Sequence, residues 1–474
     1  LGSGGVTLNG GTVSSDDATA RSFANALTIG GNVTFGEAST GALSFTSAAT
    51  NSLGGGTRTL TTAVDTTLAG ALGNGSITKA GAATLTLSNA ANSFGSLEIS
   101  AGEVAFQANA TVTGLGGAGA LTLGAGTLTV NGATNSSFGQ VISGNGGLTK
   151  TGAGTLTLSA NNTYTNATTV SGGTLVISGT NTASAVTVNG GTLAGTGEVG
   201  ATTVTAGGLI APGNSPGNLT VGDFTMDGGG GYLWEITNVA GTAGTEWDLI
   251  TITGATSITA TSTPGDTFSI FLTGSSITGW DQNTNYTWAI MDWSGGTAPA
   301  SFDADVFTLN TASFTDPVSG LFSLSTNATS LLLTYDGTAG SPAYTNGAGG
   351  WSNSFSPALV NDADALFEGT GGTATNDIAS GTFNSIGTIT FVTNAGAYTL
   401  VAASNAAGFA ATNALIAGGN IVNESSNTQT INLALSVAGN KTIDTTGANV
   451  VMNGDIIGAG GLVKTGANTL TLAG

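Results

Sequence analysis

A phrase of 15 residues occurs three times in this chain, and it constrains the fold more than any other feature of the sequence. Residues 73–87 read GNGSITKAGAATLTL, residues 144–158 read GNGGLTKTGAGTLTL, and residues 458–472 read GAGGLVKTGANTLTL. Each copy contains a Gly-rich turn, a short strand that ends in lysine, a second Gly turn and a strand of alternating Thr and Leu. Such alternation places Leu on a buried face and Thr on a solvated face. The chain is therefore predicted to be a repetitive β structure.

A shorter repeat follows the second copy: GTLTL, GGTLVI, GGTLAG and GGLIAP. Its first apolar residues are Leu156, Leu175, Leu193 and Leu209, so the intervals are 175 − 156 = 19, 193 − 175 = 18 and 209 − 193 = 16. This period fits one turn of a solenoid that carries two or three short strands. A hairpin meander or a sandwich is the alternative, but it should show paired two-residue turns. The predicted fold class is all-β, a parallel β-helix.

Proline and tryptophan mark a different region in the middle of the chain. Proline removes a ladder hydrogen bond, and the seven prolines all lie between Pro212 and Pro357. The six tryptophans share the same region. We therefore predict a β-helix over 1–222, a Trp-rich module over 223–340 that is sandwich-like or a broadened part of the solenoid, and the start of a second β-helix over 341–474. The tryptophans are Trp234, Trp247, Trp280, Trp288, Trp293 and Trp351.

The sequence stops at Gly474 without the polar cap that solenoids need for solubility. We expect a segment of a longer polypeptide, or a subunit whose ends are completed by neighbouring copies.

Charge and residue types exclude several classes of partner and chemistry. Six basic residues against 26 acidic ones give 6 − 26 = −20, a field that repels nucleic acid and anionic lipid headgroups. The sequence contains no run of about 18 apolar residues, the length that would predict a membrane-spanning helix. The chain has neither histidine nor cysteine, which removes His-dependent triads, imidazole and thiolate zinc sites, disulfides and cysteine nucleophiles.

Two motifs resemble those of serine enzymes. GNSPG at 213–217 fits G-x-S-x-G with Ser215 as the nucleophile, but Pro216 lacks the backbone N–H that would line an oxyanion hole. Ser76 and Lys79 fit S-x-x-K, yet the other two copies of the phrase have Gly in place of the serine. We predict a turn at the first motif and, at the second, a lysine that caps a corner with its stem over apolar surface and its ammonium in water.

Carboxylate pairs are the remaining candidates for catalysis or metal binding. Residues two apart on a strand share a face, so Asp303/Asp305 and Asp362/Asp364 could form hydrolytic pairs, as could the adjacent Asp16-Asp17. The cluster NDADALFEG at 361–369 offers hard oxygen ligands for calcium. Solvated turn aspartates are the favoured interpretation. We assign no catalytic, cofactor-binding or metal-binding residue, and calcium is the one ion left open.

The segment GGLTKTGAGTLTLSANNTYTNATTVSGGTLVISG (146–179) closely resembles the autotransporter-associated β-strand repeat, also called the passenger-associated transport repeat. The segment APGNSPGNLTVGDFTMDGGGGYLWEI (211–236) resembles the part that often follows the last repeat in long proteins of this type. The resemblance implies a secreted or cell-surface passenger outside a Gram-negative-type bacterium, with a β-helical stalk. The C-terminal membrane barrel of autotransporters has no counterpart in this sequence.

The expected function is that of an extracellular stalk or fibre of stacked β-rungs, without catalysis. Its expected partners are copies of itself or further repeats of a longer chain. An adhesin that binds glycans or surfaces through 234–351 is the alternative, favoured by exposed tryptophans and disfavoured by buried ones. A polysaccharide-active enzyme is third, and would need two carboxylates in a groove beside Arg21 or Arg58.

Overall fold

The computed structural model describes residues 4–213, 216–318 and 320–337 without interruption. Beyond these it describes shorter stretches, which are 343–344, 349–350, 355–356, 365–376, 388–402, 415–416, 420–433, 435–436, 440–457 and 460–473. The chain forms two compact units, and each is described by itself. The first contains 1–280, 287–316 and 323–334; the second contains 281–286, 317–322 and 335–474.

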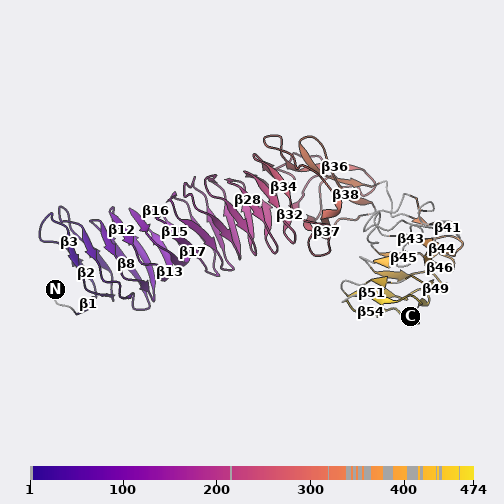
Figure 1. Cartoon of the computed structure of the whole chain (residues 1–474), viewed down its shortest axis with the longest axis horizontal. Helices are drawn as coiled ribbons and strands as arrows, with labels where there is room; N and C mark the ends of the chain where they lie inside the picture. The colour runs from indigo at the N-terminus through magenta and orange to yellow at the C-terminus, as the bar shows by residue number, and fades with distance from the viewer. Residues whose placement is uncertain are drawn as a thin grey trace. The chain divides into compact units, whose positions relative to one another are not determined.

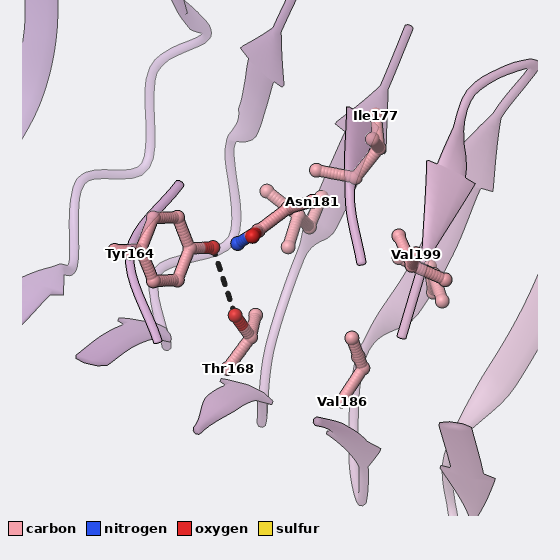
Figure 2. Close-up of a pocket in the computed structure, with 8 residues that line it drawn as sticks. Tyr164, Thr168, Ile177, Asn181, Val186 and Val199 are labelled. Atoms are coloured by element: carbon pink, nitrogen blue, oxygen red, sulfur yellow. Dashed lines mark hydrogen bonds between the residues drawn. The ribbon is translucent and has the colours of Figure 1, made fainter. Parts of the chain in front are cut away.

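The first unit is a coil of short strands that stack in parallel along its length (Figure 1). One sheet, called sheet A, runs along nearly the whole coil and receives a strand from most turns. Its strands are β1 (Val6–Leu8), β2 (Gly11–Val13), β4 (Leu27–Ile29), β5 (Val33–Phe35), β7 (Asn51–Ser52), β8 (Thr57–Thr62), β10 (Leu72–Gly73), β11 (Ser76–Ala80), β13 (Asn92–Ile99), β15 (Ala110–Gly117), β17 (Thr127–Val130), β20 (Gly147–Lys150), β22 (Thr168–Val170), β25 (Val186–Val188), β28 (Thr202–Val204), β31 (Phe224–Met226) and β34 (Thr256–Ile258).

Three further sheets complete the turns of the coil. Sheet B covers the N-terminal half, while sheets C and D serve the later turns. The first turns give two strands to sheet A and one to sheet B, and the turns at β13 and β15 give one strand to each of these two sheets. The later turns give one strand each to sheets A, C and D. Sheet B contains β3 (Arg21–Phe23), β6 (Leu43–Phe45), β9 (Thr66–Leu68), β12 (Thr84–Leu87), β14 (Glu103–Phe106), β16 (Ala120–Leu123) and β19 (Ile142–Gly144). Sheet C contains β18 (Ser136–Phe138), β21 (Thr155–Leu158), β23 (Thr174–Ile177), β26 (Thr192–Gly195), β29 (Leu209–Pro212), β32 (Gly231–Glu235), β35 (Phe268–Gly274) and β37 (Phe307–Phe314). Sheet D contains β24 (Thr180–Asn181), β27 (Glu198–Val199), β30 (Asn218–Val221), β33 (Leu249–Ile252), β36 (Tyr286–Asp292), β39 (Ser330–Asp336) and β38 (Leu321–Thr326).

The strand register confirms the predicted period of the coil. Leu156 pairs with Leu175, and Leu175 pairs with Leu193, at intervals of 19 and 18 residues. The next interval differs from the prediction, because Leu193 pairs with Ile210 rather than with Leu209. Ile210 is buried and Leu209 is only half-buried. The all-β parallel solenoid predicted from the sequence is therefore correct, and one position of the shorter repeat shifts by one residue.

The parallel ladders continue through the Trp-rich region. Strand β32 pairs in parallel with β29 and β35, and β35 pairs in parallel with β37. A single 3₁₀ turn, η1 (Ala304–Val306), interrupts the described part of this region. Trp234, Trp288 and Trp293 are buried, whereas Trp247 and Trp280 are half-buried. Trp351 lies outside the described residues. The region thus extends the coil with longer strands and a bulkier interior.

The second unit is built from three more sheets. Its strands pair mostly in parallel, and β40 with β42 is the antiparallel exception among its described pairs. Sheet E contains β42 (Phe355–Ser356), β40 (Ala343–Tyr344), β43 (Ala365–Phe367), β45 (Ile389–Phe391), β48 (Ile421–Asn423), β51 (Lys441–Asp444) and β54 (Leu462–Thr465). Sheet F contains β41 (Gly349–Gly350), β44 (Gly372–Asn376), β46 (Tyr398–Ala402), β49 (Gln429–Ile431), β52 (Val450–Met452) and β55 (Leu470–Leu472), and sheet G contains β47 (Leu415–Ile416), β50 (Leu435–Ser436) and β53 (Ile456–Ile457). Phe367, Phe391 and Leu400 are among the residues of its own hydrophobic core. No helix among the described residues is long and apolar enough to span a membrane.

Candidate functional site

The lysine of the repeated phrase forms a recurring corner inside the coil. The side chains of Lys79 in β11 and Lys150 in β20 are 0% and 1% exposed. Each ammonium donates to one carbonyl of its own corner and to one carbonyl of the following turn. The acceptors are Gly81 O at 2.8 Å and Ala101 O at 3.0 Å for Lys79, and Gly152 O and Gly172 O, the latter at 3.2 Å, for Lys150.

The prediction that the ammonium stays in water is wrong for these two lysines. Strand alternation places Lys79 on the same face as Ile77, and Lys150 on the same face as Leu148, and that face is the interior. Burial lowers the pKa of Lys79 to about 8, although the nearby Glu103 acts in the opposite direction. Burial also lowers the pKa of Lys150. The corner therefore joins two turns through charge-assisted hydrogen bonds of a buried ammonium, a strong type of hydrogen bond.

The third copy of the corner differs from the first two. Lys464 in β54 is exposed, and its ammonium donates to Thr465 O at 3.2 Å and Gly466 O at 2.5 Å. Both acceptors belong to its own corner. The intra-corner contact therefore forms without the contact to a following turn.

Asparagines supply a second link between turns that the sequence interpretation missed. An Asn side-chain oxygen accepts the backbone N–H that begins a strand of the preceding turn. A recurring Asn a few residues after a TLTL strand was the available signal, as in LSNAANSF and LSANNTYT. The buried examples are Asn51 to Leu27 N at 2.9 Å, Asn92 to Leu72 N at 2.8 Å and Asn162 to Ile142 N at 2.9 Å.

A buried carboxylate, Asp248, fixes the segment that leads into β33. Its Oδ1 accepts from Gly217 N at 2.7 Å and its Oδ2 from Glu235 N at 3.0 Å, while Trp234 Nε1 donates to its backbone oxygen at 3.0 Å. Burial raises the pKa of Asp248 to about 7; the two backbone hydrogen bonds oppose this effect and the Glu235 charge adds to it. An acid directly before the buried strand in WDLITI was the signal in the sequence.

The serine motifs do not form a nucleophile and base. Ser215 lies outside the described residues. Ser76 and Lys79 point to opposite faces of β11, because residues three apart on a strand alternate. The Ser76 hydroxyl accepts the backbone N–H of Ser96 at 3.1 Å, and the lysine binds carbonyls instead. The S-x-x-K match is therefore part of the wall of the coil.

The first pair of candidate carboxylates lies on the surface beside Arg21. Asp16 and Asp17 both form exposed ion pairs with Arg21. The distance between Arg21 Nη2 and Asp17 Oδ1 is 3.1 Å. The Thr19 backbone N–H is the main cause that lowers the pKa of Asp17. Arg58 instead donates through Nε to Ile29 O at 3.3 Å.

Of the other acidic candidates, one pair lies at a 3₁₀ turn and the other pair lies outside the described residues. Asp303 and Asp305 are exposed, and Asp303 caps η1 by accepting Asp305 N at 3.0 Å. Asp362, Asp364 and the first part of the 361–369 cluster lie outside the described residues. Within the described residues, no three His, Cys, Asp or Glu side chains gather closely enough to hold a metal ion.

The fold and the recurring corner together define a parallel β-solenoid repeat protein. The family profile of the passenger-associated-transport-repeat matches residues 77–106, 148–177, 172–194 and 462–474, and these matches include all three lysine corners. The chain therefore carries the autotransporter passenger repeat, as the sequence resemblance indicated. Repeats of this family imply a secreted or cell-surface protein. No curated protein matches the chain.

Proposed function

We propose that this chain is an extracellular structural scaffold, a surface stalk or fibre outside a Gram-negative-type cell, and that it performs no catalysis. Its proposed partners are copies of itself or further repeats of a longer chain. The observation that carries the proposal is the lysine corner, because two copies join successive turns in the same way. A contact repeated at this spacing strengthens a coil and offers no substrate a unique place to bind.

Continuous parallel ladders support a mechanical role. Each turn of the coil pairs with its neighbours, so tension along the axis loads many backbone hydrogen bonds together. The corner lysines and the buried asparagines add hydrogen bonds between successive turns. Calcium at 361–369 remains a proposal as well, with carboxylate oxygens as its ligands.

Negative-stain imaging of the native material tests the fibre. Fibres many times longer than one chain would support assembly, whereas isolated short rods would contradict it. Force spectroscopy on the full chain tests the mechanical role: Lys150→Met should lower the force at which the coil opens, because two carbonyls lose a charged donor. The neighbouring outward residue gives the control Thr149→Val, which should leave that force unchanged.

The two alternatives receive less support. Exposed tryptophans were the feature expected of a glycan-binding aromatic platform, and three of the described tryptophans are buried. For the enzyme, Arg21 does lie beside two carboxylates, but all three side chains form an exposed ion-pair cluster. Neither observation favours these functions over the scaffold.

A further inference from the structure

An outward-facing column of threonines runs along sheet A. Register pairs join each threonine to the equivalent one in the next turn, so the side chains stand one strand spacing, about 4.8 Å, apart. Every member points outward between two buried neighbours of its strand and is half-buried. We call this column the Thr ladder; it comprises Thr129, Thr149, Thr169, Thr187, Thr203 and Thr225.

The hydroxyls of the Thr ladder have no hydrogen-bond partner among the residues that the structure describes. Across the described residues, none of the six makes a side-chain hydrogen bond to another protein group. On sheet B, by contrast, the hydroxyls of Thr122 and Ser143 lie 3.0 Å apart and bond to each other. A threonine hydroxyl offers one donor and two acceptor positions. The ladder therefore presents a regular row of hydrogen-bond donors and acceptors that face the solvent.

The surface around most of the ladder carries no charge. Between Glu103 and Glu198 the one charged residue is Lys150, and its ammonium is buried against carbonyls. The chain as a whole has a net charge of −20, so its acids are concentrated outside this stretch. Asp223 and Asp227 flank Thr225 and mark the end of the uncharged surface. A ligand for this face needs no charge of its own.

We propose that the Thr ladder binds a linear, neutral polysaccharide that lies along the coil. Sugar hydroxyls both donate and accept, and a polymer repeats them at a regular spacing, so one chain can pair with many rungs. Each contact is weak, but successive contacts on one polymer are intramolecular and add avidity. This binding goes beyond the scaffold proposed above and places glycan recognition on the coil instead of on the tryptophans.

A second copy of the chain is the other possible occupant of a flat sheet face. Two copies packed side by side on this face would bring bodies of net charge −20 together along their length, whereas end-to-end assembly into a fibre leaves the face open. A neutral glycan meets no such barrier. The solvent-facing hydroxyls also fit a ligand that is rich in hydroxyl groups. The observations therefore favour the glycan.

The test uses native affinity electrophoresis of the full chain in gels that contain a soluble β-glucan, a galactomannan or a dextran, with alginate as the charged comparison. The ladder variant is the triple substitution Thr169→Val, Thr187→Val and Thr203→Val, which removes hydroxyls and retains β-branched side chains. The control variant is Thr155→Val, Thr174→Val and Thr192→Val. It alters a column of three threonines on sheet C that Leu209 interrupts.

At least one neutral polysaccharide should retard the wild-type chain, with the effect increasing with polymer length, and alginate should not. The ladder variant should lose most of this retardation, about tenfold in apparent affinity for three lost rungs, while the control variant should retain it. Circular dichroism confirms that both variants are folded. The proposal is overturned if no neutral polysaccharide retards the wild type, or if the ladder variant is retarded equally. Sedimentation that shows a wild-type dimer abolished in the ladder variant would assign the face to a second copy. These outcomes leave the imaging test of the scaffold unaffected.

Discussion

Lys79 and Asp248 are both buried, and their hydrogen-bond partners are backbone groups. Desolvation disfavours the charged form of each, so it lowers the pKa of the lysine and raises the pKa of the aspartate. The two groups should therefore give the stability of the coil opposite dependences on pH. The lysine affects stability above about pH 8, and the aspartate affects it below about pH 7.

For Lys79, the free energy of unfolding should rise between pH 8 and about 10.4, the ordinary pKa of lysine. In this range the unfolded chain binds more protons than the folded one, so a higher pH favours folding. Urea denaturation of Lys79→Met beside the wild type measures the effect. The Met variant should lack the rise, and Thr78→Val, which alters the outward face of the same strand, should retain it. Parallel curves for wild type and Met variant would contradict the assignment.

For Asp248, the free energy of unfolding should fall as the pH rises from about 4, the ordinary pKa of aspartate, to about 7. Here the folded state binds more protons, so acid favours folding and the contribution is lost as the pH rises through the folded pKa. Thermal unfolding followed by Trp fluorescence reports the change, because Trp234 contacts this residue. Asp248→Asn should remove the slope over this range. A slope that survives in the Asn variant would show that another group causes it.

Single strands in this coil are two to eight residues long, so the contacts between turns decide their stability. The buried asparagines and the tight glycine corners supply these contacts. For each feature, a substitution at a position enclosed by the coil should destabilise the protein more than the same substitution at a matched open position.

Asn162→Ala should destabilise the coil by about 1–3 kcal/mol, because it leaves the Ile142 N–H buried without an acceptor. Asn135 accepts the backbone N–H of Thr155, which begins a strand of the following turn, at 2.9 Å, but Asn135 is exposed, so water can replace it. Asn135→Ala should therefore cost less. Hydrogen exchange at Ile142 should accelerate in the first variant only. Equal losses in chemical denaturation would contradict the role of burial.

Gly173→Ala should destabilise the coil more than Gly207→Ala. Both glycines have positive φ, +59° and +79°, and precede strands of sheet C. A Cβ at Gly173 would lie 2.2 Å from Gly152 O, whereas the nearest atom at Gly207 is 3.8 Å away. The Gly207 substitution should therefore cost only the left-handed backbone, about 1–2 kcal/mol. Midpoints of urea unfolding give the comparison, and equal midpoints would contradict the steric argument.

The sequence predicts the turns of the coil well because period and alternation are local properties. The fourth copy of the shorter repeat shows the limit: Leu209 and Ile210 are both apolar, so only the pairing of whole strands decides which one enters the core. The lysines show another limit. Alternation in Ile77-Thr78-Lys79 predicts that the lysine faces the interior, as it does, whereas the preference of a charged group for water predicts the opposite. The acceptors, Ala101 O and Gly172 O, come from the next turn and leave no mark in the local sequence.

At the scale of the molecule, the chain consists of two compact units with their own interiors. In a stack of repeats, each turn contacts mainly its neighbours, so a local defect should remain local. The two interiors should therefore lose stability separately.

Leu400→Ala should destabilise the second unit by about 2–5 kcal/mol, because it opens a cavity in a fully buried core. Leu156→Ala is the matched variant in the first unit, where that side chain is also 0% exposed. Hydrogen exchange followed by mass spectrometry should show each variant losing protection in its own unit. Loss of protection throughout the chain from either variant would show that the units unfold together.

The strand register also bears on how the gene for such a chain can change length. Thr168 pairs with Val186, so removing residues 168–185 would join Ala167 to Val186 and place β25 where β22 had been. Every ladder would close again in the same register. A deletion shorter by one residue would reverse the inward and outward faces of the strand. Unequal recombination between similar repeats removes or adds whole turns, so populations of related genes are expected to differ in length by multiples of one turn.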